Sequence, residues 1–452
     1  MTKKKSQVFS QRVHFVGIGG IGTSALARFY LAQKSHVSGS DLVRSEITDA
    51  LQKEGAHIFV GPHSSKNLPV KTDVAVFTAA TPKDNLELKE ARRRKIKIKS
   101  YAEALGELTK KYFTIAVAGT HGKSTTTAMI SLMMTHAGLD PTVIVGTKLK
   151  EFGNTNFRAG KSKYLVIEAD EYAGSFWHYY SDIAVVTNMD RDHLDFYKTM
   201  RGVEQSFQKF LRNAVAKKNV SGVIVLNKDD KRLASLTKST FFKKYKNIFH
   251  WFSRRDPEMH DIQKYLRVFG EHNRMNALAA YRVGEMLGIS KKMILEGMAL
   301  YHGAWRRFEY RGEFDGAKIF DDYAHNPAKV KAALAGARER FPEKRIWCVF
   351  QPHQLERTKI LFNDFVKSFD NAHHVILLDI YQVAGREKQN REKEVNAFQL
   401  AQAIAKRNQN DVYYLPYHSQ LRDFFKDSVG KHDIIMMVGA GDIWKLTDQL
   451  LY

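Results

Sequence analysis

Residues 118–127 of the sequence, A-G-T-H-G-K-S-T-T-T, have the side chains and the spacing to hold a nucleoside triphosphate. They follow the apolar run 113–118 and precede a helical pattern. The spacing is not the strict phosphate-loop pattern, because a valine stands where its first glycine would be. In such a loop, backbone N–H groups surround the phosphates, a lysine reaches the β- and γ-phosphates and a hydroxyl binds Mg²⁺. We therefore expect ATP to be bound by Gly119, Thr120, Gly122, Lys123, Ser124 and Thr125.

Acidic residues follow two further apolar runs, 164–168 and 183–188. The first run ends in E-A-D-E, which begins at Glu168, and the second leads into N-M-D-R-D-H-L-D, which contains His193. The carboxyl ends of parallel strands meet at one edge of a sheet, where the magnesium carboxylate of a phosphate-loop protein belongs. We expect Glu168 to be that ligand beside Ser124, and His193 is a candidate ligand of a second metal ion.

A glycine-rich turn, G-I-G-G-I-G, follows the short apolar run 12–16 and precedes another helical pattern. It satisfies G-x-G-x-x-G in the context that the pattern requires, with a strand before it and a helix after it. Asp41, at the end of the next predicted strand, is placed to reach a ribose. The pattern predicts a diphosphate-linked nucleotide without distinguishing NAD from a UDP-sugar, and a tight turn without a ligand is the alternative. The residues concerned are Gly17, Gly19, Gly20 and Gly22.

Further polar groups stand in the second half of the chain. Asn273 and Asn276 are three residues apart on one predicted helix face, so their amides could address one ligand such as adenine, although helix capping by Asn273 fits equally well. Charged residues also end predicted strands, in R-R-F (306–308), D-D-Y-A-H-N-P (321–327) and Q-P-H (351–353), the last followed by Arg357. Each of these could line a cleft or be a solvated loop.

Composition defines the class of protein. Of the 452 residues, 44% are hydrophobic and 26% charged, as in a folded globular protein of several domains. Cys348 is the only cysteine, so the chain can form no internal disulfide or zinc cluster, as expected in a reducing compartment. No apolar run approaches the ~20 residues that span a bilayer, and the basic N-terminus lacks a signal-peptide pattern. We expect a cytoplasmic protein without a membrane span.

The chain is strongly basic, with 71 Lys and Arg against 48 Asp and Glu and a formal net charge of +23. Such an excess suits a polyanionic partner, and a basic ATP-dependent nucleic-acid-binding protein is a distant alternative. However, the basic residues occur in short groups such as 92–95 and 243–244 rather than in one tail. A generally basic surface with phosphate-bearing ligands explains this pattern better, so we expect no nucleic-acid partner.

Strand and helix patterns alternate along the chain, which predicts an α/β fold with parallel sheets covered by helices. A boundary is expected near 108–112, where a charged helix end precedes a new strand. Helical periodicity covers 272–288 and 290–300, and a hairpin is expected around Asp315 and Gly316. Further strands are expected at 74–78, 96–98, 223–227, 345–350, 374–379 and 434–438.

These patterns occur in an order that resembles the Mur ligases, the ATP-dependent amino-acid ligases of peptidoglycan precursor synthesis, which build the cell wall. The resemblance rests on G-I-G-G-I-G, G-T-H-G-K-S-T-T-T, E-A-D-E, N-M-D-R-D-H-L-D, E-H-N-R-M-N-A-L-A-A, R-R-F, D-D-Y-A-H-N-P and F-Q-P-H, and covers nearly the whole chain. It implies three domains: a Rossmann-like UDP-sugar-binding domain (1–109), a central P-loop ATPase domain with a parallel-rich sheet (110–308) and a C-terminal Rossmann-like domain (309–452).

The resemblance also implies a reaction. ATP and Mg²⁺ would convert the lactyl carboxylate of UDP-N-acetylmuramate to an acyl phosphate, which the amine of L-alanine would attack. Lys123 and Arg307 would neutralise charge, and His325 and Arg357 would position the amino acid. Ser124 and Glu168 would hold one Mg²⁺ and His193 another. Asn273 and Asn276 would meet the adenine and Asp322 the ribose of ATP, while the glycine turn and Asp41 would bind the UDP-sugar.

Three positions bear on the branch within the family. Relatives that add later residues carry a carbamylated lysine about 14 positions after the motif histidine, where this chain has Phe207, with Lys209 two residues on. The missing lysine favours the alanine-adding branch. Tyr172 after E-A-D-E instead resembles the ligases that attach a recycled tripeptide to the same sugar nucleotide, which are the alternative. Gln354 replaces an arginine that is usual after Q-P-H, and glutamine cannot grip a carboxylate bidentately.

Overall fold

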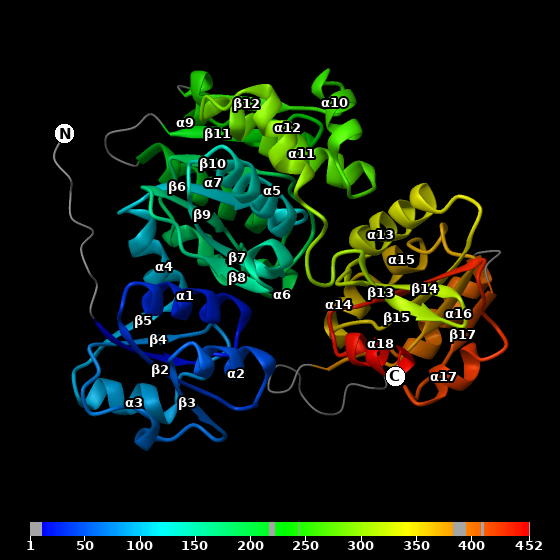
Figure 1. The fold of residues 1–452 in the computed structure, drawn as a ribbon, viewed down its shortest axis with the longest axis horizontal. Coiled ribbons are helices and arrows are strands. Elements are labelled where there is room, and N and C mark those ends of the chain that lie inside the picture. The colour runs from blue at the N-terminus through cyan, green and yellow to red at the C-terminus, as the bar shows by residue number, and fades with distance from the viewer. Residues whose placement is uncertain (1–10, 217–221, 244, 383–394, 408–410, 452) are drawn as a thin grey trace. The chain divides into compact units, whose positions relative to one another are not determined.

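The protein is described here by a computed structural model that covers residues 11–216, 222–243, 245–382, 395–407 and 411–451 (Figure 1). The side chains of residues 194 and 195 also lie outside this description. The chain forms two compact units, the first from Met1–Leu266 and Met275–Tyr301 and the second from Arg267–Arg274 and His302–Tyr452. Across the described residues, every helix is too short or too polar to cross a membrane.

The first sheet of unit 1 has five parallel strands in the order β3-β2-β1-β4-β5 (Figure 1). Helices follow the strands in the connections that parallel pairing requires. Because helices cover the sheet, its central strand β1 is buried on both faces, and only its first residue is exposed. The bounds are β1 (Arg12–Val16), α1 (Ile21–Ala32), β2 (His36–Asp41), α2 (Glu46–Lys53), β3 (His57–Val60), η1 (Ser65–Asn67), β4 (Val74–Phe77), α3 (Leu86–Arg93), β5 (Lys97–Ser100) and α4 (Tyr101–Thr109).

The second sheet of unit 1 has seven strands in the order β12-β11-β10-β6-β9-β7-β8, all parallel except β8, which pairs antiparallel with β7. Its first elements are β6 (Phe113–Ala118), α5 (Lys123–His136), β7 (Thr142–Leu149), η2 (Lys150–Phe152), β8 (Thr155–Arg158), β9 (Tyr164–Glu168), η3 (Tyr172–His178) and β10 (Ile183–Val186). There follow α6 (Leu194–Tyr197), α7 (Met200–Ala216), β11 (Val223–Asn227), α8 (Lys231–Leu236), α9 (Thr240–Lys243), η4 (Lys246–Ile248), β12 (Phe249–Phe252), α10 (Glu258–Tyr265), α11 (Glu271–Met286) and α12 (Lys291–Ala299).

Unit 2 contains a six-stranded sheet in the order β13-β14-β18-β15-β16-β17, in which only β13 is antiparallel to its neighbour. Two apolar clusters cover its faces, one against α13 and α16 and one against α17 and α18. The bounds are β13 (Glu309–Phe314), β14 (Ala317–Asp322), α13 (Pro327–Arg340), β15 (Arg345–Phe350), α14 (Leu355–Ile360), α15 (Phe362–Val366), β16 (His374–Leu377), α16 (Ala397–Arg407), β17 (Asp411–Tyr414), α17 (Gln420–Phe425), β18 (Asp433–Val438) and α18 (Ile443–Leu451).

A buried polar contact joins the two sheets of unit 1. Asn156 of β8 is 1% exposed, and its Oδ1 accepts a hydrogen bond of 2.7 Å from Nη1 of Arg28 in α1. Its Nδ2 donates to the Ser24 hydroxyl at 2.9 Å and to the carbonyl of Ile21, the first residue of α1. The hairpin β7–β8 therefore holds the start of α1, next to the glycine turn, and apolar residues of both sheets form one continuous core around this contact.

A second buried polar cluster lies in the first sheet, around Glu87 of α3. Its carboxylate accepts hydrogen bonds from Nε2 of His14 (2.9 Å), the Ser40 hydroxyl (2.7 Å), Nδ1 of His63 (2.9 Å) and Nδ2 of Asn67 (3.0 Å). Burial raises the pKa of Glu87, but these hydrogen bonds outweigh burial and lower it to about 2. The carboxylate is therefore ionised although it is fully buried.

Candidate active site

The loop between β6 and α5 has the conformation of a phosphate cradle. Gly122, directly before α5, has φ +83°, which an L side chain adopts only with strain. A Cβ atom there would lie 2.1 Å from Oδ1 of Asn276 on α11, so a side chain at this position would force Asn276 or the loop to move. The predicted loop residues are thus placed together, with Lys123 and Ser124 in the first turn of α5. The exposed N–H groups of such a helix start favour an anion.

Lys123 is bound by the carboxylate of Glu171, which is not one of the predicted site residues. Its Nζ donates to Oε2 of Glu171 at 2.7 Å and to the carbonyl of Gly119 at 2.8 Å. Burial lowers the pKa of Lys123, but the charges of Glu171, Asp170 and Glu168 raise it well above its ordinary value. Lys123 is therefore a permanently charged ammonium at the phosphate loop.

The expected pairing of Ser124 with Glu168 is present. The Ser124 hydroxyl donates to Oε1 of Glu168 at 3.1 Å, and the backbone N–H of Gly146 in β7 donates to Oε2 at 2.8 Å. A hydroxyl and a carboxylate at this distance are hard oxygen ligands of the kind that Mg²⁺ takes. The parallel register places Glu168 of β9 beside Val117 of β6, the strand that leads into the loop before Ser124, as the parallel pattern predicts.

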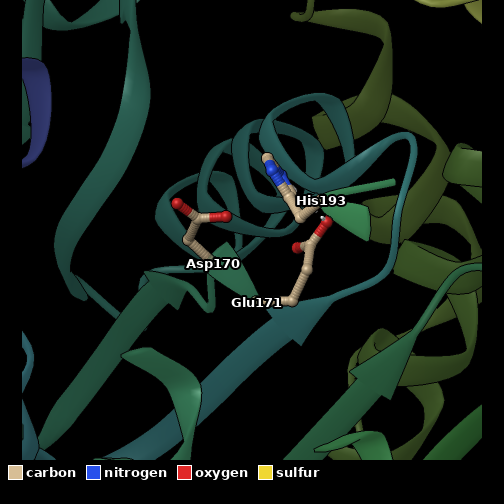
Figure 2. A group of neighbouring side chains, drawn as sticks. All are labelled: Asp170, Glu171 and His193. Carbon is tan, nitrogen blue, oxygen red and sulfur yellow. Dashed lines mark ion pairs between the residues drawn. The ribbon is translucent and has the colours of Figure 1, made fainter. Parts of the chain in front are cut away.

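Asp170, Glu171 and His193 form a second group at the same edge, shown in Figure 2. One ligand atom from each lies within 4.8 Å of the others, and Nε2 of His193 is 3.9 Å from Oε1 of Glu171. That Oε1 atom is buried and has no hydrogen-bond partner among the described residues, while the other oxygen of Glu171 binds Lys123. An unsatisfied buried carboxylate oxygen beside an imidazole and a second carboxylate fits a divalent cation.

Asp170 and Glu171 were not among the predicted site residues, because E-A-D-E was interpreted as a strand end with one functional carboxylate, Glu168. β9 ends at Glu168, and the chain then turns, so Glu168 and Glu171 reach different partners. The spacing of the carboxylates was visible in the sequence, but the turn was not. His193, which was selected, has φ +52° and packs its ring against Tyr172 at 4.9 Å between centroids.

The position of the family's carbamylated lysine is occupied by a buried aromatic side chain. Phe207 on α7 is fully buried and contacts Phe176, with 5.2 Å between ring centroids. Lys209 does not replace a lysine there, since its Nζ lies 4.1 Å from the ring of Trp177. Neither Phe207 nor Lys209 therefore places a lysine side chain beside Glu171 and His193.

The glycine turn lies between β1 and α1 and is bound to the end of β2. The N–H groups of Gly17 and Ile18 donate to the Ser40 carbonyl at 2.8 and 3.0 Å, and the N–H of Gly19 donates to Oδ2 of Asp41 at 2.9 Å. Asp41, predicted to reach a ribose, therefore contacts the turn itself. Together with Gly20 and Gly22, these residues form the predicted nucleotide turn, and their role in binding a UDP-sugar stays a prediction.

In unit 2, Asp322 holds the loop that carries Arg307. Its carboxylate accepts the N–H groups of Phe308 at 2.9 Å and Ala324 at 2.8 Å. Burial raises the pKa of Asp322, and the charge of Arg307 opposes this rise. The guanidinium of Arg307 lies 5.3 Å from the centre of the Tyr323 ring. The contact of Asp322 with an ATP ribose stays a prediction.

The remaining predicted residues of unit 2 gather at the ends of β14 and β15. Nδ1 of His325 is 2.9 Å from the Tyr323 carbonyl, and its ring centroid is 6.2 Å from that of His353. Nη1 of Arg357 contacts Nδ1 of His353 at 3.3 Å. Gln354, which precedes α14, has φ +71°, so the departure from the family pattern coincides with a left-handed backbone. The structure thus brings His325 and Arg357 to one histidine that the predicted site residues omitted.

The two predicted asparagines of α11 have different surroundings. Asn276 is buried beside Gly122, whereas Nδ2 of Asn273 donates to the Phe269 carbonyl at 2.6 Å in unit 2. α11 begins at Glu271, so Asn273 lies within its first turn and the alternative that it caps the helix is wrong. Their contact with adenine stays a prediction.

Comparison with known proteins identifies the family. Residues 12–113, 117–284 and 306–441 match the families described as "Mur ligase family, catalytic domain", "Mur ligase middle domain" and "Mur ligase, glutamate ligase domain". The chain is 39% identical over 464 residues to a UDP-N-acetylmuramate–L-alanine ligase of Clostridium acetobutylicum, with 98% of each chain covered. The chain belongs to the Mur ligase family.

Other comparisons agree that the chain is a Mur ligase. The chain is 40% identical to a UDP-N-acetylmuramate–L-alanine ligase of Acetivibrio thermocellus, and the match covers 98% of this chain and 96% of the relative. The structure of the ligase of that name from Thermotoga maritima aligns with TM-score 0.78 and 25% identity over 98% of both chains. A murein peptide ligase from Psychrobacter arcticus aligns with TM-score 0.71 at 21% identity over 98% of both chains, which shows a shared fold. The three α/β domains predicted for the chain are confirmed, whereas the residue numbers of their boundaries stay predictions.

Proposed function

We propose that this Mur ligase joins L-alanine to the lactyl carboxylate of UDP-N-acetylmuramate and hydrolyses ATP to do so. The observation that carries the proposal is the identity of 37 to 40% with relatives named for this reaction, over 98% of the chain. The alternative, attachment of a tripeptide, is supported by Tyr172 alone, since the likeness to a murein peptide ligase at 21% identity shows a shared fold. The cytoplasmic location stays a prediction.

The chemistry requires two anions to meet, because the carboxylate oxygen must attack the γ-phosphate of ATP. Lys123 supplies a positive charge at the phosphate loop, and its raised pKa keeps that charge at any physiological pH. The structure pairs this charge with the buried carboxylate of Glu171. In this proposal Lys123 adds its positive charge where the carboxylate oxygen attacks the γ-phosphate. The acyl phosphate then formed is the electrophile that the alanine amine attacks, releasing phosphate.

Magnesium is expected to accompany ATP at this edge. The unsatisfied oxygen of Glu171, with Asp170 and His193, fits one cation, and Ser124 with Glu168 fits another. When bound, Mg²⁺ would withdraw charge from the phosphate oxygens. The N–H of Gly146 and the ammonium of Lys123 bind the carboxylates of Glu168 and Glu171, which would be its ligands. Arg307, His325 and Arg357 keep their predicted role in positioning phosphate and amino acid.

The test is phosphate release from ATP in the presence of Mg²⁺ and UDP-N-acetylmuramate, with the product checked by mass. L-alanine, glycine, L-serine and the L-Ala-γ-D-Glu-diamino acid tripeptide are compared as acceptors. The proposal expects a product that contains alanine and phosphate release that depends on alanine. A tripeptide product without an alanine product would overturn it in favour of the recycling reaction. The variant Lys123→Met controls for contaminating ATPases.

A further inference from the structure

Tyr101 stands between the glycine turn and the acidic edge of the second sheet, and no role predicted above uses it. It is the first residue of α4, whose start is fixed by a capping box. The Ser100 hydroxyl accepts the N–H of Glu103 at 3.2 Å, and the Glu103 carboxylate accepts the N–H of Ser100 at 2.7 Å. The position of the Tyr101 backbone at the carboxyl end of β5 is therefore set by local hydrogen bonds.

On one side the phenol of Tyr101 lies against the first turn of α1. A Cβ atom on Gly22 would lie 3.0 Å from Cζ and 3.1 Å from the hydroxyl oxygen of Tyr101. The ring therefore occupies the space that a side chain at Gly22 would fill, and its hydroxyl reaches the helix start that follows the glycine turn. This is the end of α1 that carries unsatisfied N–H groups and attracts phosphate.

On the other side Tyr101 interacts electrostatically with the carboxylates of the ATP-binding edge. Burial raises the pKa of its hydroxyl well above the ordinary value, and the charges of Glu168 and Asp170 raise it further. The same two charges raise the pKa of the neighbouring Tyr179, whose side chain is fully buried. The Tyr101 hydroxyl is therefore protonated at physiological pH and is able to donate a hydrogen bond. Within the part of the chain that the structure describes, it has no hydrogen-bond partner.

We propose that the Tyr101 hydroxyl donates a hydrogen bond to an anionic oxygen of the sugar nucleotide. The inference rests on the proposed function, in which the substrate extends from the glycine turn, at its diphosphate, to Lys123, at its lactyl carboxylate. Tyr101 contacts Gly22 beside the glycine turn, and it interacts electrostatically with the carboxylates near Lys123. An unpartnered donor on that path gains most from an anionic acceptor, because charge-assisted hydrogen bonds are the stronger ones. The acceptor is either a diphosphate oxygen or the carboxylate.

The experiment compares Tyr101→Phe with the wild-type chain and with Tyr30→Phe. The phenylalanine keeps the ring against Gly22 and removes only the hydroxyl. Tyr30 is a matched control, since it is a buried phenol of α1 packed among Phe15 and Phe29, and the pKa of its hydroxyl is also raised by burial. Calorimetry measures binding of UDP, UDP-N-acetylglucosamine and UDP-N-acetylmuramate, and steady-state assays measure KM and kcat for each substrate.

The expected result is that Tyr101→Phe weakens binding of UDP-N-acetylmuramate about 10-fold or more, the range for a lost hydrogen bond to a charged group. The KM for ATP and the thermal unfolding temperature should match those of the wild type, and Tyr30→Phe should bind normally. Equal weakening for all three ligands assigns the hydroxyl to the diphosphate, and weakening for UDP-N-acetylmuramate alone assigns it to the carboxylate.

Unchanged binding and kinetics of Tyr101→Phe would overturn the inference while leaving the proposed function intact, because the wild-type chain would still make the alanine product. Weakened binding accompanied by a lower unfolding temperature and a raised KM for ATP would also overturn it, since that pattern describes a structural role. A wild-type chain that binds no sugar nucleotide would refute both proposals.

Discussion

Gly122 and Gly138 stand at the two ends of α5 and allow the steric role of the phosphate loop to be measured. Their φ angles are nearly equal, +83° and +75°. A Cβ atom on Gly122 would lie 2.1 Å from Oδ1 of Asn276, whereas a Cβ on Gly138 would meet nothing within 4 Å. Gly122→Ala and Gly138→Ala therefore impose the same kind of backbone strain, but only the first forces a neighbour to move.

The magnitude follows from these two contributions. Alanine with a left-handed backbone costs about 1–2 kcal/mol at either position. At Gly122 the added methyl must also displace Asn276, which is only 6% exposed, and overpacking of this kind costs roughly 1–3 kcal/mol more. If the loop relieves the overlap by leaving its phosphate-binding conformation, ATP binding must restore that conformation, and the binding free energy is weaker by the overpacking cost. At 1.4 kcal/mol per tenfold, affinity for ATP falls about 10- to 100-fold.

The assay is the Kd for ATP by calorimetry, with thermal unfolding measured in parallel. Both variants should lose similar stability from backbone strain, whereas only Gly122→Ala should lose ATP affinity. The double variant Gly122→Ala/Asn276→Ala, which removes the obstructing amide, should regain part of that affinity if Asn276 acts as an obstacle alone. Equal ATP affinity in Gly122→Ala and Gly138→Ala would refute the argument that this loop has no room for a side chain.

Three further changes test other parts of the structure. The pKa of Glu87 is lowered from 4.5 to about 2, so its ionised form contributes about 3 kcal/mol to the free energy of unfolding. This contribution is present above pH 4.5 and is lost as the pH falls toward 2. Glu87→Gln should therefore unfold at lower urea concentration at pH 7 and lose this dependence on acid. Asn156→Ala should lower stability by about 2–3 kcal/mol, measured by denaturation, because it removes the hydrogen bonds that join β8 to buried groups of α1; a loss below 0.5 kcal/mol would contradict this contact. Glu171→Gln should raise the Mg²⁺ concentration for half-maximal phosphate release about 10-fold or more, and an unchanged titration would exclude Glu171 as a ligand.

Local patterns in the sequence were sufficient for most of the fold. The apolar runs 113–118, 164–168, 223–227 and 345–350 coincide with β6, β9, β11 and β15, because a strand buried on both faces must be apolar throughout. The hairpin around Asp315 is confirmed as β13 and β14. Four short edge strands, β3, β8, β12 and β17, were not predicted, since their pairing depends on distant partners rather than on their own composition. The interior strand β7 was also not predicted, although it is eight residues long and mostly buried.

Some residues of the candidate site could also be predicted from the sequence, and others could not. The loop around Lys123, the pair Ser124 and Glu168, and His193 could be found from residue type and spacing, because a phosphate loop and its metal carboxylates occupy the ends of neighbouring parallel strands. Spacing alone did not reveal Glu171 as the partner of Lys123, since the turn after β9 decides which carboxylate enters the site.

Contacts between distant segments were decided by the tertiary structure alone. Asn276 meets Gly122 across 154 positions of sequence, and Asn156 meets Arg28 across 128. Tyr101 reaches Gly22 from a different helix. Residue type and periodicity determine which strand or helix forms locally, and thus which chemistry a segment can offer. Which of those segments touch is set by the packing of whole sheets and helices, and no local pattern contains that information.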